Sequence, residues 1–134
     1  MAIRVVRLGS PRRVDEGLRI GAVRRPPRGV PKSEYAARDL YDLWYPNLAP
    51  SEELLQTFRP VSAKSFPAFR RRYLREMKVP GPRYDIALLA ALSHQSAFSL
   101  GCYCQEPALC HRSILAELLR RAGAAMLDGE QTEC

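Results

Sequence analysis

The sequence predicts a single compact α/β domain of three layers, with helices packed on a mainly parallel sheet. Short apolar segments typical of strands alternate with longer amphipathic segments typical of helices. A strand, a loop and a helix also follow one another near the end of the chain. Because 134 residues can bury one ordinary hydrophobic core, we expect one domain over residues 1–127 and a flexible tail over residues 128–134.

Four segments have the composition of strands or of short extended stretches. Ala2–Leu8 alternates apolar and basic residues, and Leu18–Val23 places apolar side chains on one face. Tyr41–Tyr45 is either a short strand or an irregular aromatic segment, and Ala97–Cys104 is typical of a buried strand. Pro26–Pro31 lies between the second and third of these segments and predicts an extended loop.

Helices are predicted in the part of the chain that follows residue 50. Ser51 is a suitable N-cap for a first short helix, and the acidic residues Glu52 and Glu53 that follow it favour the helix dipole. Phe66–Lys78 repeats aromatic and apolar residues at three- and four-residue steps. Pro80–Pro82 should break the chain before a third helix over Arg83–Ser96. The last helix is expected over Cys110–Ala122 and should stop at the following glycine.

The formal net charge of +7 is concentrated in the first part of the chain. Residues 1–38 hold ten of the 21 Lys and Arg side chains and three of the 14 acidic ones, so this segment carries the whole excess. A local positive field favours anionic partners such as nucleic acid, nucleotides or phosphorylated metabolites. Surface charge without a partner is the competing interpretation.

The chain is expected to lie in the cytoplasm, away from membranes. Its apolar runs are shorter than the roughly 20 residues that span a bilayer, and its first residues are too charged for a secretory signal. The cysteines are therefore expected to be reduced thiols, metal ligands or redox groups rather than a disulfide framework.

The strongest chemical signal is a cluster of Cys, His and Arg residues where the late strand meets the last helix. Cys102 and Cys104 are two residues apart, so both side chains should point to one face of the strand. Cys110, His111 and Arg112 fall at the start of the helix, where N–H groups and the helix dipole favour anions or a thiolate. Cys110 is thereby expected to be nucleophilic and to be alkylated faster than an ordinary thiol.

Four interpretations of this cluster remain open. Cys104 and Cys110 could act as a nucleophile or redox thiol with its resolving partner, with His111 as an acid or base. The three cysteines and His111 could form a Cys3His metal site, although their spacing is atypical. Arg112 and the helix amides could hold an anion alone, or the thiols could simply pack as small apolar groups. We favour the reactive thiol, and we predict neither a bound metal nor a cofactor.

Several ordered motifs resemble those of the YeaO-like family, known as domain of unknown function 488. The resemblance covers residues 1 to about 127, and the Cys-His-Arg signature also matches the broader family. This sequence departs from the family at residues 24–27, where members commonly have an Asp-Arg-Leu-Trp-Pro stretch. The matching stretches are Glu16-Gly17-Leu18-Arg19, Pro27-Arg28-Gly29-Val30, Asp42-Leu43-Trp44, Leu48-Ala49-Pro50-Ser51, Phe69-Arg70-Arg71-Arg72-Tyr73, Cys102-Tyr103-Cys104 and Cys110-His111-Arg112.

The resemblance implies a compact α/β domain of bacteria and archaea without an established activity. Some relatives keep the Pro-Arg-Gly-Val motif and lack the Cys-His-Arg signature, which makes Arg19 and Arg28 candidates for a shared anion-binding task. We therefore expect Arg19, Arg28 and Arg112 to hold an anion beside the thiols, in a candidate thiol-dependent enzyme acting on an anionic substrate. A nucleic-acid-binding module without catalysis is the main alternative.

Overall fold

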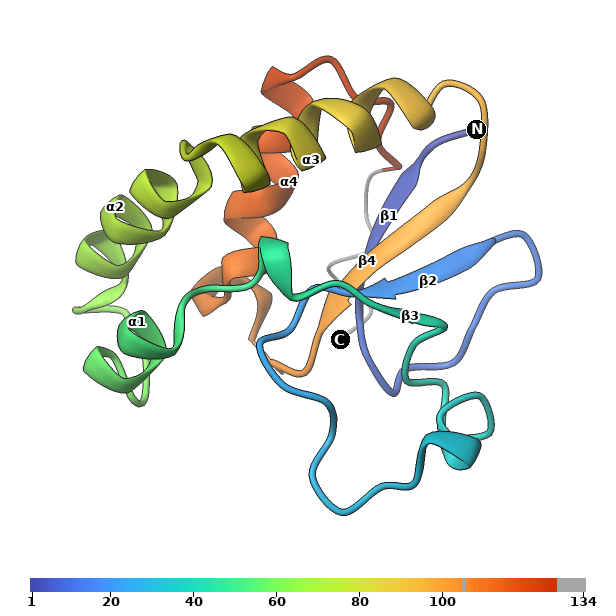
Figure 1. Cartoon of the computed structure of the whole chain (residues 1–134), viewed down its shortest axis with the longest axis horizontal. Helices are drawn as coiled ribbons and strands as arrows, with labels where there is room; N and C mark the ends of the chain where they lie inside the picture. The colour runs from blue at the N-terminus through green and yellow to red at the C-terminus, as the bar shows by residue number, and fades with distance from the viewer. Residues whose placement is uncertain (105, 128–134) are drawn as a thin grey trace.

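The computed structural model describes residues 1–104 and 106–127, and the tail expected over residues 128–134 lies outside the described residues. Its sheet has four strands, all parallel, in the order β1-β4-β2-β3 (Figure 1). The α/β architecture with a parallel sheet is therefore confirmed. The strands are β1 Ile3–Arg7, β2 Leu18–Gly21, β3 Leu43–Trp44 and β4 Phe98–Cys102.

The α-helices pack on one face of this sheet and bury the main core against it (Figure 1). Alternate strand residues such as Ile20 and Leu100 point into this core, where they meet Phe69, Tyr73 and Leu115 of the helices. Residues 8–17 and 35–42 cover the other face, so irregular chain forms the layer opposite the helices. The helices are α1 Glu52–Thr57, α2 Phe66–Met77, α3 Pro80–Leu92 and α4 His111–Arg121.

The start of α3 corrects the expected break at residues 80–82. The helix begins at Pro80, after Val79 in an extended conformation, and it ends at Leu92. Prolines are tolerated in the first helical turn because the N–H groups there have no partner within the helix. The residues that were expected to interrupt the chain therefore open the helix. The N-cap expectation at Ser51 is confirmed, since its side chain accepts a hydrogen bond from the Leu54 amide at 3.1 Å.

The central strand β4 is shorter than the segment predicted from the sequence. It ends at Cys102, so the side-chain alternation of a strand does not extend to Cys104. Cys102 is buried whereas Cys104 is exposed in the loop that follows. The two thiols of the Cys-x-Cys motif therefore lie in different environments.

A buried polar network lies on the face of the sheet opposite the helices. The guanidinium of Arg19 donates to both carboxylate oxygens of Glu16, at 2.7 and 2.9 Å, and the Ser99 hydroxyl donates to the same carboxylate at 2.6 Å. Gly17 permits this arrangement because it has a positive φ of 80° and a Cβ there would lie 2.1 Å from the Ala97 carbonyl oxygen.

Among the described residues, no helix is long and apolar enough to cross a membrane.

Candidate functional site

The thiol cluster lies at the carboxyl end of the central strand. Cys102 is the last residue of β4, and Cys110 is the N-cap of α4 in an extended conformation. Their Sγ atoms are 2.6 Å apart, and both side chains are buried. The carboxyl end of a parallel sheet is where ligands commonly bind in α/β proteins. The fold therefore brings two thiols together from positions eight residues apart in the chain.

His111 joins this cluster in a defined orientation. Its Nε2 atom lies 2.7 Å from the Ala22 carbonyl oxygen, and its Nδ1 atom lies 3.7 Å from the Cys110 Sγ. A carbonyl oxygen only accepts hydrogen bonds, so Nε2 carries the proton and the lone pair of Nδ1 faces the thiols. Burial lowers the pKa of His111, which keeps the ring neutral.

Cys104 is the exposed member of the cluster. The neighbouring thiols of Cys102 and Cys110 lower its pKa well below the usual range, and the charge of Arg112 acts in the same direction. The pKa of Cys102 is raised to about 12, chiefly by the neighbouring Cys104, and burial raises the pKa of Cys110. Of the three thiols, Cys104 is therefore the one whose pKa is lowered.

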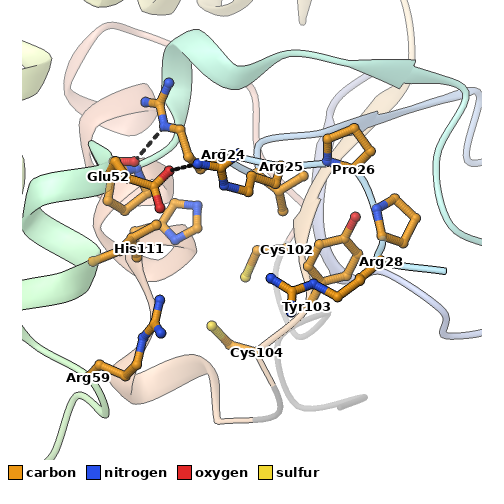
Figure 2. Close-up of a pocket in the computed structure, with 14 residues that line it drawn as sticks. Arg24, Arg25, Pro26, Arg28, Glu52, Arg59, Cys102, Tyr103, Cys104 and His111 are labelled. Atoms are coloured by element: carbon orange, nitrogen blue, oxygen red, sulfur yellow. Dashed lines mark hydrogen bonds and ion pairs between the residues drawn. The ribbon is translucent and has the colours of Figure 1, made fainter.

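A pocket of about 520 Å³ opens beside these thiols. In Figure 2, Cys104 points toward Cys102, with His111 to one side and Tyr103 and Arg28 to the other. Three stretches of chain build the walls: the loop after β2, the residues around α1, and the end of β4 with the start of α4. The lining consists of Val23, Arg24, Arg25, Pro26, Pro27, Arg28, Pro50, Glu52, Leu55, Arg59, Cys102, Tyr103, Cys104 and His111.

The four arginines of this lining differ in their protein partners. Arg24 donates to the backbone carbonyls of Ala49 and Pro50, at 3.0 and 2.9 Å. Arg25 forms an ion pair with Glu52 at 2.9 Å. Within the described residues, Arg28 and Arg59 form no hydrogen bond or ion pair with the protein, and both are exposed. Figure 2 shows these two side chains on opposite sides of Cys104, so two guanidinium groups are available to a ligand.

The two other arginines predicted to bind an anion lie elsewhere. Arg19 is fully buried, and in addition to the Glu16 carboxylate its guanidinium contacts the carbonyls of Ser10 and Asp39 at 2.9 and 2.7 Å. Arg112 is also buried, donates to the Val6 carbonyl at 3.0 Å, and lies close enough for its charge to lower the thiol pKa values. Neither residue lines the pocket, so Arg28 is the one member of the predicted set of three arginines that does.

Sequence reasoning missed several residues of the pocket. Arg59 follows α1, about 45 residues before the thiols in the chain, and no local pattern connects it with them. Tyr103 lies between the two cysteines of the Cys-x-Cys motif, where the alternation of a strand would turn it away from the face that the cysteines share. The end of β4 at Cys102 removes the basis for that expectation.

The cluster also has the donor atoms of a metal site. One donor atom each from Cys102, Cys110 and His111 lies within 4.8 Å of the other two, and all three residues are buried. These are the residue types that bind zinc and other thiophilic ions.

Comparison with known proteins identifies the family of the chain. Residues 3–123 match the family model DUF488-N3a, which is described as the active DUF488-N3 subclade. No match was found among curated proteins or solved structures. Because the family model covers most of the sequence, the resemblance to the YeaO-like proteins is confirmed and the chain belongs to the DUF488 family.

Proposed function

We propose that the pocket binds an anionic ligand between Arg28 and Arg59 and presents it to the thiol of Cys104, which acts as the nucleophile. The single observation that carries this proposal is the lining of the pocket, where both guanidinium groups and the exposed thiol face the same cavity. Exposed arginines without protein partners can form bidentate hydrogen bonds with a phosphate or a carboxylate. The match to a subclade described as active agrees with a chemical role for the site.

The buried members of the cluster support the exposed thiol. The pKa of Cys104 is lowered by the neighbouring thiols of Cys102 and Cys110 and by the positive charge of Arg112. These interactions favour the thiolate, which is the nucleophilic form of cysteine. This arrangement moves the expected reactive thiol from Cys110 to Cys104, because Cys110 is 2% exposed and burial raises its pKa.

The size of the pocket favours an organic anion over a bare inorganic one. Its volume of about 520 Å³ lies within the roughly 300–1,000 Å³ of typical small-molecule sites. Val23, Pro26, Pro27 and Leu55 add apolar wall to the cationic rim. A phosphorylated metabolite or a nucleotide combines the charge and the apolar surface that such walls accommodate.

The ion pairs of the N-terminal segment favour this pocket over an extended nucleic-acid surface. Arg12 pairs with Asp42 at 2.8 Å, and Arg38 pairs with Glu34 at 2.7 Å. With the pairs of Arg4, Arg19 and Arg25, at least five of the ten basic side chains of residues 1–38 have an acidic partner within the fold. Binding to mixed DNA and RNA that weakens steeply with salt would favour the nucleic-acid alternative.

The proposal is tested by comparing an anionic and a neutral alkylating reagent of similar size. Iodoacetate and iodoacetamide are reacted with reduced, chelator-treated protein, and the modification of Cys104 is followed by peptide mass spectrometry. We expect the ratio of the iodoacetate rate to the iodoacetamide rate to exceed that of free N-acetylcysteine. Two unit charges about 4 Å apart interact by about 1 kcal/mol in water, so Arg28→Ala or Arg59→Ala should each lower the ratio roughly fivefold.

Lys64→Ala is the matched control, because Lys64 is an exposed cation that does not line the pocket. This variant should keep the ratio of the wild type. If Arg28→Ala and Arg59→Ala also keep that ratio, the pocket does not direct anions to Cys104 and the proposal is wrong.

A further inference from the structure

The buried side of the cluster has three donor atoms that the proposed anion chemistry does not require as ligands. They are the Sγ atoms of Cys102 and Cys110 and the Nδ1 atom of His111, all within 4.8 Å of one another. They come from the end of the central strand and the start of the following helix, two rigid elements of the core. Two thiols and an imidazole are a donor set that prefers thiophilic ions such as Zn²⁺ to Mg²⁺ or Ca²⁺.

The hydrogen bond of His111 provides a second, independent observation. Its Nε2–H donates to the Ala22 carbonyl at 2.7 Å, which directs the lone pair of Nδ1 toward the two sulfur atoms. Metal-binding histidines commonly make this kind of bond, because a carbonyl or carboxylate on one ring nitrogen fixes the tautomer and the orientation of the other. The imidazole is therefore oriented as a ligand.

The distances can be compared with those of a tetrahedral zinc site. Zn–S bonds of about 2.3 Å and Zn–N bonds of about 2.0–2.1 Å imply an S···N separation of about 3.6 Å and an S···S separation of about 3.8 Å. The Cys110 Sγ and the His111 Nδ1 are already 3.7 Å apart. The Cys102 and Cys110 sulfurs are 2.6 Å apart, so they would separate by about 1 Å through side-chain rotation when an ion enters.

We propose that Cys102, Cys110 and His111 bind a tetrahedral, thiophilic divalent metal ion, with its fourth coordination position facing the pocket beside Cys104. Cys102 and His111 line the pocket whereas Cys110 does not, so the open position is directed toward the cavity. On binding, both thiols release their protons to solvent, and two thiolates neutralise the charge of the ion. A neutral centre is compatible with a buried site. Three protein ligands and one open position are the arrangement of catalytic zinc sites.

This inference goes beyond the proposed function and does not rest on it. The anion-binding groups Arg28 and Arg59 are not ligands of the ion, and the Cys104 thiol remains on the pocket side. The alkylation ratio of the preceding section is measured on chelator-treated protein. Anion steering without metal binding, or metal binding without anion steering, would therefore refute one proposal and leave the other in place.

The test is a titration of reduced, metal-free protein with Co²⁺ and then with Zn²⁺. A Cys134→Ser background removes the remaining cysteine of the sequence. We expect one Co²⁺ per chain, sulfur-to-cobalt charge-transfer absorption in the near ultraviolet, and intense visible bands of tetrahedral Co²⁺, all abolished by one equivalent of Zn²⁺. Cys110→Ala and His111→Ala should each weaken binding by more than the roughly 10–100-fold that follows loss of a supporting group.

Cys104→Ala is the matched control within the same cluster. It should keep the one-to-one stoichiometry and the tetrahedral spectrum, with an affinity within about tenfold of that of the parent, the lower bound for loss of a supporting group. Circular dichroism and a cooperative unfolding transition establish that each variant is folded, and Cys110→Ser replaces Cys110→Ala if the latter is not. The absence of stoichiometric binding, or an equal loss in Cys104→Ala and the folded Cys110 variant, would overturn the three-ligand site.

Discussion

The central strand β4 contributes to two buried polar clusters that differ in one respect. Ser99 belongs to a closed network with Glu16 and Arg19, in which the carboxylate and the guanidinium bond to each other and to the protein around them. Cys102 belongs to the thiol cluster, which has one exposed member and borders a pocket. The comparison indicates that burial of a charge marks a structural role when its partners are all protein groups. A buried cluster that also borders a cavity, as the thiol cluster does, can interact with a bound ligand.

The largest effect is expected when the closed network loses its carboxylate. Glu16→Gln leaves the Arg19 guanidinium buried without its counter-charge, and breaking a buried pair in this way costs about 3–5 kcal/mol of the free energy of unfolding. Glu34→Gln is the matched control, because its pair with Arg38 is exposed and should contribute about 0–1 kcal/mol. Urea unfolding of the two variants measures both values. Equal, small losses would show that the network does not hold the fold together.

The same network should make the stability of the protein depend on pH. Burial alone would raise the pKa of Glu16, but hydrogen bonds from Arg19 and Ser99 bring it below its ordinary value. A carboxyl group whose pKa is lower in the folded state stabilises the fold above its unfolded pKa of about 4.3 and loses this contribution as the pH falls through the folded pKa. The wild type should therefore lose more stability than Glu16→Gln on acidification from neutral pH.

The pH experiment is internally controlled because Asp42 and Glu117 also have lowered pKa values and are present in both proteins. Their contributions to the acid dependence cancel in the difference. Parallel curves of unfolding free energy against pH for the wild type and Glu16→Gln would contradict the assignment to Glu16.

The sequence predicted the elements of the fold better than the partners of individual side chains. Hydrophobic periodicity and the cap at Ser51 indicated α1, α2 and α4 because these signals are local. The strand order β1-β4-β2-β3 depends on contacts between residues far apart in the chain, which a local pattern does not contain. The prolines at the start of α3 show that proline does not always end a helix. Proline disrupts the interior of a helix, but it fits the first turn.

The candidate site, like the fold, was predicted well where its residues are close in sequence and poorly where they are far apart. The thiols and His111 lie close together in sequence and in space, so their spacing predicted one cluster. The roles of the arginines did not follow from the sequence, because a charge pattern does not show which side chain is buried. In the sequence, Arg19 and Arg28 are both arginines of the same basic segment. In the structure, Arg19 is enclosed by Glu16 and two carbonyl groups, whereas Arg28 lines the pocket.

A smaller effect on stability is expected when the thiol cluster loses a buried member. Cys110→Ala removes one buried sulfur atom and breaks no ion pair, so the loss should be comparable to the roughly 0.5–1.5 kcal/mol of deleting a buried methyl group. Metal-free, reduced protein is required for this measurement, because a bound ion would add its own stabilisation. A loss as large as that of Glu16→Gln would remove the distinction between the open and the closed cluster.

The smallest effects are expected at the exposed groups of the pocket. Cys104→Ala and Arg28→Ala should each change the free energy of unfolding by less than about 0.5 kcal/mol, because both side chains are exposed and Arg28 has no partner within the described residues. Arg19→Ala is the contrasting arginine variant, since it removes a fully buried guanidinium that bonds to Glu16, Ser10 and Asp39. If Arg28→Ala destabilises the protein as much as Arg19→Ala, the pocket arginine is a structural group. A stable Arg28→Ala protein with a lowered iodoacetate preference would instead assign this arginine to ligand binding.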